Sequence, residues 1–91
     1  MKGNTVIGFA LGIDAGGVVT GNYATGNVFG MNIGPGPGTG NTVIGNTASF
    51  NEHFGMQVSC PSNVTDNTVV GNNIGNLALG EGCNNTNNVA P

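Results

Sequence analysis

The fold is decided by two adjoining segments in the middle of the chain, Thr42-Val43-Ile44-Gly45-Asn46 and Thr47-Ala48-Ser49-Phe50-Asn51. Each places Thr and apolar residues ahead of a closing Asn, a residue that tolerates a sharp bend between strands. The pair recurs once before and once after, and its closing asparagines are Asn22 and Asn27, Asn46 and Asn51, Asn67 and Asn72. The steps between copies are 24 and 21 residues, and a fixed period of this kind indicates a repeat architecture.

A third segment, with the pattern apolar-Gly-x-x-apolar, precedes each pair and occurs once more after the last. It lies at 7–11, 29–33, 54–58 and 74–78, with glycines 22, 25 and 20 residues apart. Three short strands per repeat fit a coil in which each strand pairs in parallel with its equivalent one turn away, at about 4.8 Å. The sequence therefore predicts an all-β fold, a parallel β-helix of about four rungs of 20–25 residues with no capping helix. We expect rungs at approximately 7–28, 29–53, 54–73 and 74–91 in a single segment, 1–91, that is either incomplete or stacked through its open ends.

Alternation along the strands assigns the interior. In the glycine-containing segments we expect the glycines to face outward, and the inward positions are Ile7, Phe9, Leu11, Phe29, Met31, Ile33, Phe54, Met56, Val58, Ile74, Asn76 and Ala78. The other strands should bury Val19, Val43 and Val64, and Ala24, Ala48 and Val69. Stacked amides can satisfy one another one rung apart, so we expect two asparagine ladders, Asn22, Asn46 and Asn67 in one and Asn27, Asn51 and Asn72 in the other.

The composition is consistent with such placed residues. Gly and Asn supply 34 of the 91 residues, a proportion that would otherwise suggest disorder. Disordered chains usually combine high charge with few apolar residues, whereas here 5% of residues are charged and 37% are hydrophobic. Lys2 is the only Lys or Arg, which argues against nucleic acid as a partner, and no stretch approaches the roughly 18 apolar residues of a membrane span.

The Asn-closed repeats, the Phe-Gly-Met strands at 29–31 and 54–56 and the stretch Cys60-Pro61-Ser62-Asn63-Val64 resemble right-handed parallel β-helix proteins. The likeness is to the pectin-lyase-like superfold, in particular to bacterial NosD-like repeats of the periplasmic copper-binding type. It implies a right-handed coil, and it points first to polysaccharide lyases and hydrolases, whose usual groove lies over the outer face of one sheet. We expect no copper site, because Met31 and Met56 hold core positions.

Cys60 and Cys83 are 23 residues apart, close to one period. Equivalent positions on neighbouring rungs lie within the roughly 4.4–6.8 Å between Cα atoms that a disulfide needs. We expect the bridge to form in an oxidising compartment, which indicates an extracellular, periplasmic or cell-surface protein. No signal peptide is recognisable, because the apolar run at 6–13 is broken by glycines and fits a strand better.

The chain lacks a recognisable catalytic constellation. The outward positions beside the strand glycines carry no titratable side chain, there is no Arg, and the acids Asp14, Glu52, Asp66 and Glu81 are not placed as a catalytic pair. His53, the only histidine, has no further ligand at a metal-binding spacing. We therefore expect no enzyme activity, no cofactor and no metal.

A ligand face is expected where the repeats differ most, since variable loops commonly form the binding rim of a solenoid. Its candidate residues are Asn32, Gln57, His53 and Glu52, and such neutral amides favour a neutral polar ligand such as a glycan. The sequence predicts a non-catalytic scaffold or surface-interaction module that binds neutral polysaccharide and pairs with itself, or with adjoining β-helix rungs, at its open ends. The alternative is a fragment of a carbohydrate-active lyase or hydrolase whose catalytic rungs lie outside this chain.

Overall fold

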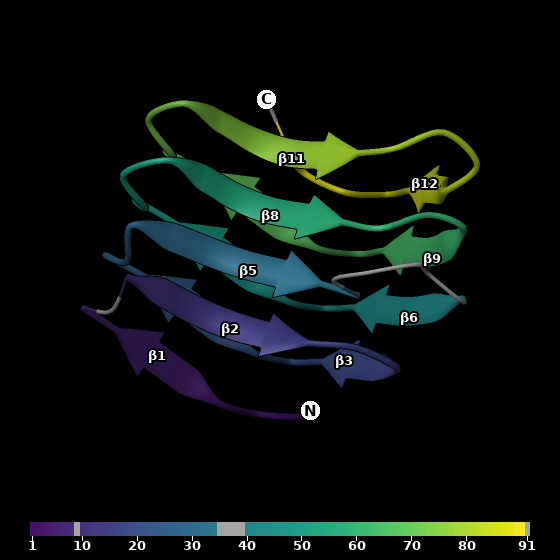
Figure 1. Ribbon diagram of the computed structural model, residues 1–91, viewed down its shortest axis with the longest axis horizontal. Helices are drawn as coiled ribbons and strands as arrows, with labels where there is room; N and C mark the ends of the chain where they lie inside the picture. The colour runs from purple at the N-terminus through teal and green to yellow at the C-terminus, as the bar shows by residue number, and fades with distance from the viewer. Residues whose placement is uncertain (9, 35–39, 91) are drawn as a thin grey trace.

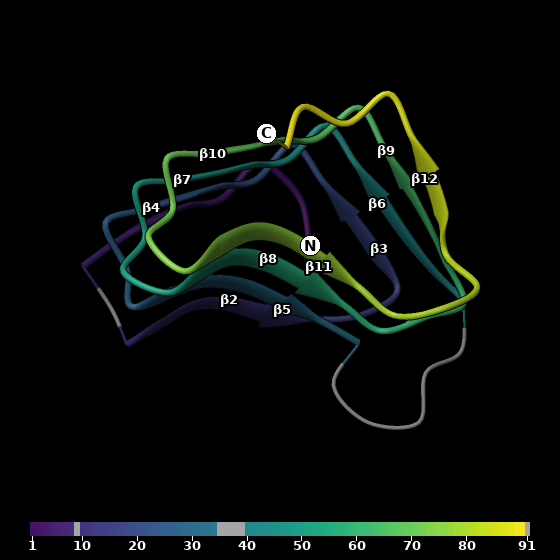
Figure 2. The ribbon, with the colours of Figure 1, turned by 90° about the horizontal axis from the view of Figure 1, so that it is seen from above.

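The computed structural model describes residues 1–8, 10–34 and 40–90, and every helix or strand element among them is a strand. The strands wind around one core as a parallel β-solenoid with three sheets of four strands each (Figure 1). Each strand pairs in parallel with its equivalent one turn away. Seen from above, the three sheets form three walls around the core (Figure 2). The all-β solenoid predicted from the period is confirmed.

Each sheet is named here after its first strand. The β1 sheet contains β1 (Thr5–Ile7), β4 (Tyr23–Thr25), β7 (Thr47–Ser49) and β10 (Thr68–Val70). The β2 sheet contains β2 (Leu11–Ala15), β5 (Phe29–Ile33), β8 (Phe54–Val58) and β11 (Gly75–Leu79). The β3 sheet contains β3 (Val18–Thr20), β6 (Asn41–Ile44), β9 (Ser62–Thr65) and β12 (Asn84–Thr86).

The first turn is aligned differently from the prediction. Leu11 lies opposite Phe29, so β2 begins where the predicted segment was expected to end. Residues 5–7 form β1 instead and pair with β4. The physical reason is that Gly8, at a φ of 82°, turns the corner after β1 in the left-handed region, as Gly26 does after β4 at 66°. Gly8 is therefore a corner glycine and not a strand glycine.

Three predicted core residues fall in this misaligned turn. Ile7 and Leu11 are exposed, so their predicted inward orientation is wrong. Phe9 lies outside the described residues. Ile13, which the prediction left out of the core, is buried opposite Met31.

The last turn is shifted by one position. Gly75 lies opposite Phe54, and Leu77 lies opposite Met56. Leu77 and Leu79 pack against the core in place of the predicted Ile74 and Ala78, and Ile74 is exposed.

The strand glycines Gly30 and Gly55 are buried and face the core, which reverses the predicted orientation of these glycines and of the phenylalanines before them. A Cβ on Gly30 would lie against the carbonyl oxygen of Gly55 and 2.7 Å from Nδ2 of Asn51. The next residue, Met31, is also buried, so two successive residues point inward and the alternation restarts between them. Phe29 consequently faces outward and is 38% exposed, against the prediction.

The core is aliphatic. Its buried members are Ile13, Val19, Ala24, Met31, Ile33, Val43, Ala48, Met56, Val58, Val64 and Val69. All of them except Ile13 are predicted inward residues, so the assignment is confirmed for these ten positions, and Phe29 and Phe54 are the predicted inward residues of the middle turns that the core lacks. No Phe or Tyr in the described part of the chain belongs to this cluster.

The first predicted asparagine ladder is hydrogen-bonded and longer than expected. It contains Asn4, Asn22, Asn46, Asn67 and Asn88. The backbone N–H and the Nδ2 of each residue both donate to Oδ1 of the next, at 2.9–3.0 Å. The Nδ2 of Asn46 also donates to the carbonyl oxygen of Val19, at 2.8 Å. One amide therefore joins three successive rungs.

The second predicted ladder contains Asn27, Asn51 and Asn72, and Asn76 ends it. The backbone N–H and Nδ2 of Asn72 donate to Oδ1 of Asn76, at 3.1 and 3.0 Å. Asn76 stands in register with the inward glycine of the preceding rung, Gly55. Its amide therefore occupies the place of a further ladder residue, which explains the polar side chain predicted at an inward position.

A third, shorter ladder was not predicted. The backbone N–H of Gly17 donates to Oδ1 of Asn41, and the backbone N–H and Nδ2 of Asn41 donate to Oγ of Ser62, at 2.9, 3.1 and 3.1 Å. The hydroxyl of Ser62 in turn donates a hydrogen bond to the carbonyl oxygen of Ser59, at 2.6 Å. The change from Asn to Ser hides this column from a search for repeated asparagines.

Candidate functional site

Two columns of side chains cross the outer face of the β2 sheet. The polar column contains Asp14, Asn32 and Gln57, which lie opposite one another on successive strands. Ala78 takes the equivalent position on the last strand. The apolar column, at the starts of the strands, contains Leu11, Phe29 and Phe54. The inward glycine between the two columns is what places both of them on the same face.

A hollow of about 220 Å³ lies between these columns. Its lining is Leu11, Phe29, Met31, Asn32, Phe54 and Gln57. A second hollow of about 330 Å³ extends from the same two amides to Ser59 and Gly80. Because Asn32 and Gln57 line both hollows, the two form one groove with the amides at its middle.

His53 extends the apolar side of the groove. Its ring stacks on Phe29, with ring centroids 4.9 Å apart and an angle of 26° between the planes. The corner that carries it is held by the backbone N–H of His53, which donates to the carbonyl oxygen of Val28 at 2.8 Å. Of the four predicted ligand-face residues, Asn32 and Gln57 lie together, His53 stands against the groove wall, and Glu52 lines neither hollow.

The phenylalanines of the groove are the functional candidates that sequence reasoning missed. Phe29 and Phe54 were both predicted in the core. The Phe54 ring instead covers the next strand, where a Cβ on Gly75 would lie 2.9 Å from Cε1 of Phe54. The sequence feature that indicates their outward orientation is the glycine that follows each of them. When that glycine packs inward against an asparagine ladder, the residue before it points outward.

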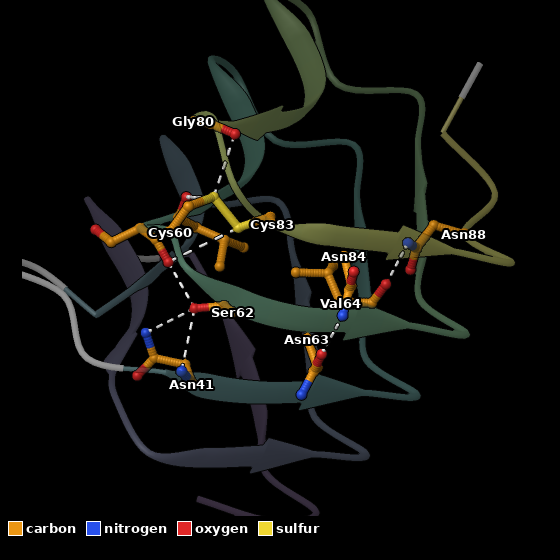
Figure 3. Close-up of a disulfide and its surroundings, with 11 residues drawn as sticks. Asn41, Cys60, Ser62, Asn63, Val64, Gly80, Cys83, Asn84 and Asn88 are labelled. Atoms are coloured by element: carbon orange, nitrogen blue, oxygen red, sulfur yellow. Dashed lines mark hydrogen bonds between the residues drawn. A yellow bond between two sulfur atoms is a disulfide. The ribbon is translucent and has the colours of Figure 1, made fainter.

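The disulfide lies beside the second hollow, next to Gly80. Cys60 and Cys83 form the predicted bridge, with their Cα atoms 5.0 Å apart (Figure 3). The Sγ of Cys60 lies 3.3 Å from the carbonyl oxygen of Gly80, a residue of the second hollow. The bridge ties this edge of the last rung to the rung before it.

Other kinds of site receive no support from the described residues. Among them, no three His, Cys, Asp or Glu side chains gather as a metal site requires. Within residues 1–8, 10–34 and 40–90 there is also no helix of the length and apolarity needed to cross a membrane.

The groove therefore combines an apolar and aromatic wall, two neutral amides and a polar extension. Such a combination is typical of ligand sites in general, where an apolar wall contributes affinity and amides contribute directional hydrogen bonds. Comparison of the chain with protein-family models, with curated proteins and with solved structures gives no match.

Proposed function

We propose that this protein is a non-catalytic β-helix module that binds a neutral polysaccharide along the groove of the β2 sheet. The observation that carries the proposal is the alignment of Phe29 and Phe54 beside Asn32 and Gln57 on one outer face. The likeness to pectin-lyase-like, right-handed β-helices and a location outside the cytoplasm belong to the same proposal, the latter supported by the disulfide.

A saccharide matches both walls of the groove. A pyranose ring has a face of C–H groups, which carry partial positive charge and favour contact with the electron-rich face of an aromatic ring. Its hydroxyls both donate and accept hydrogen bonds, and so do the amides of Asn32 and Gln57. Neither amide is fully buried, so each can exchange water for a ligand hydroxyl.

The charges near the groove favour a neutral polymer. Asp14 belongs to the polar column, and Glu52 is exposed at the corner beside His53. The single Lys, Lys2, pairs with Thr20 at the edge of the β3 sheet, away from this face. An acidic polysaccharide would therefore meet negative charge without a compensating cation.

The proposal is tested by affinity gel electrophoresis with soluble xylan, galactomannan and mixed-linkage glucan, and with polygalacturonate as the acidic polymer. We expect at least one neutral polymer to retard the protein and polygalacturonate to leave its mobility unchanged. The double variant Asn32→Ala/Gln57→Ala should bind about 10–100-fold more weakly, since each lost hydrogen bond is worth about 1 kcal/mol.

The matched control is Asn63→Ala, which removes an exposed amide from the β3 sheet and should bind as the wild type does. Failure of all three neutral polymers to retard the protein would contradict the proposal, as would equal binding by the double variant. Release of shortened chains from a polymer would also contradict the proposal, because the module is proposed to be non-catalytic.

A further inference from the structure

Phe50 has a backbone conformation that glycine adopts at the equivalent corner of every other turn. Its φ is 53°, in the left-handed region that side chains with a Cβ rarely adopt. The equivalent corners after β1, β4 and β10 are Gly8, Gly26 and Gly71, with φ values of 82°, 66° and 70°. Glycine is therefore sufficient for this turn, and a phenylalanine in the same conformation adds backbone strain.

The Phe50 side chain is also the most exposed of the large apolar side chains in the described part of the chain, at 70%. Its ring lies over Gly71, since a Cβ there would be 2.7 Å from Cε1 of Phe50. The ring thus leans along the solenoid axis over the next rung and leaves most of its surface to solvent. Core packing does not explain why phenylalanine stands here.

The position of Phe50 connects it with the groove. The corner 50–53 leads from β7 into β8, and His53 at its end stacks on Phe29. The buried Asn51 fixes this corner, because its backbone N–H and Nδ2 donate to Oδ1 of Asn72 at 2.9 and 2.8 Å. Phe50 is therefore an aromatic surface held at a set place, three residues from the wall of the hollow.

We propose that Phe50 is a further saccharide-binding residue, a platform on which a sugar unit of the polymer stacks outside the groove. The inference rests on the proposed function and extends it: the ligand continues from the groove around the corner between the β2 and β1 sheets. A neutral sugar fits this place because the ring offers an exposed apolar face and the nearest charged residue along the chain, Glu52, is negative. The strain retained at Phe50 then has a use in binding.

The test separates binding from stability with the variant Phe50→Gly. Glycine accepts a positive φ without strain, so we expect the melting temperature of this variant to equal or exceed that of the wild type. Binding to whichever of xylan, galactomannan and mixed-linkage glucan retards the wild type should weaken at least fivefold. Phe50→Tyr, which keeps the aromatic ring, should bind within about twofold of the wild type.

Asp66→Gly is the matched control, because Asp66 has a φ of 56° at a corner where other rungs carry Gly21 and Gly45. This variant relieves the same strain on the far side of the β1 sheet and should leave binding unchanged. Wild-type binding by Phe50→Gly, with weak binding by Asn32→Ala/Gln57→Ala, would overturn the inference and leave the proposed function standing. A fall in the melting temperature of Phe50→Gly by several degrees would assign Phe50 to stability and also overturn it, whereas a wild type that binds none of the polymers would overturn both.

Discussion

Replacing Asn46 by alanine is expected to lower the free energy of unfolding by about 3–5 kcal/mol, because buried groups left without partners cost about 1–3 kcal/mol each. Asn46 is 1% exposed and stands at the middle of the first ladder. Its Oδ1 accepts from both the backbone N–H and the Nδ2 of Asn22, and its Nδ2 donates to the carbonyl oxygen of Val19. Alanine removes all three of these hydrogen bonds, and of the two Asn22 donors only Nδ2 keeps another acceptor, the carbonyl oxygen of Met1 at 3.1 Å. The loss is measured by urea unfolding followed by circular dichroism.

The control for this variant is Asn73→Ala. Asn73 is exposed, and the hydrogen bond that its backbone N–H donates to the carbonyl oxygen of Asn51 survives the substitution. Its stability should change by less than about 0.5 kcal/mol. Equal unfolding midpoints for the two variants would contradict the view that the ladders hold the rungs together.

Replacing Gly30 by alanine should destabilise the fold by at least about 3 kcal/mol, at the upper end of what overpacking a core costs. The added methyl group would meet the carbonyl oxygen of Gly55 and Nδ2 of Asn51. The carbonyl belongs to the backbone of the next strand, so relief requires moving β8 away from β5. Thermal unfolding followed by circular dichroism measures the effect.

Gly40→Ala provides the comparison, because a Cβ at Gly40 meets nothing within 4 Å. This variant should unfold at or slightly above the wild-type temperature, since alanine restricts the unfolded chain more than glycine does. If Gly30→Ala were as stable as Gly40→Ala, the glycine would have to face outward, as simple alternation along the strand predicts.

The parts of the fold that repeat in the sequence could be predicted from it. The period of the closing asparagines and of the glycine-containing segments is enough for the three strands per turn and the two main ladders, and alternation along the strands adds most of the aliphatic core. It also places Cys60 and Cys83 on neighbouring rungs, where they form their bridge. These features depend on spacing alone, and spacing is visible in a single chain.

The orientation of the strand starts could not be predicted in the same way, because glycine has two uses in this chain. Gly8 turns a corner at positive φ, whereas Gly30 makes room for an asparagine ladder. The pattern apolar-Gly-apolar looks the same in both cases, so the first turn was misaligned. Phe29 faces outward because the inward position beside it lies against Asn51 and has room only for glycine. This contact joins segments that are distant in the sequence.

The candidate site was accordingly half visible. Asn32 and Gln57 occupy equivalent places in two repeats, so their juxtaposition follows from the period. The aromatic wall beside them was hidden by the assignment of Phe29 and Phe54 to the core. Without that wall, the amides alone gave no reason to expect a groove.

The binding claim is tested most directly by the amide NMR spectrum of isotope-labelled protein, titrated with a soluble oligosaccharide of the polymer that retards it. If the groove of the β2 sheet binds the saccharide, the side-chain amide signals of Asn32 and Gln57 and the backbone signals of Phe29 and Phe54 should shift together and saturate at one concentration. Shifts confined to residues of the β1 or β3 sheet, or a spectrum that none of the neutral oligosaccharides changes, would contradict it.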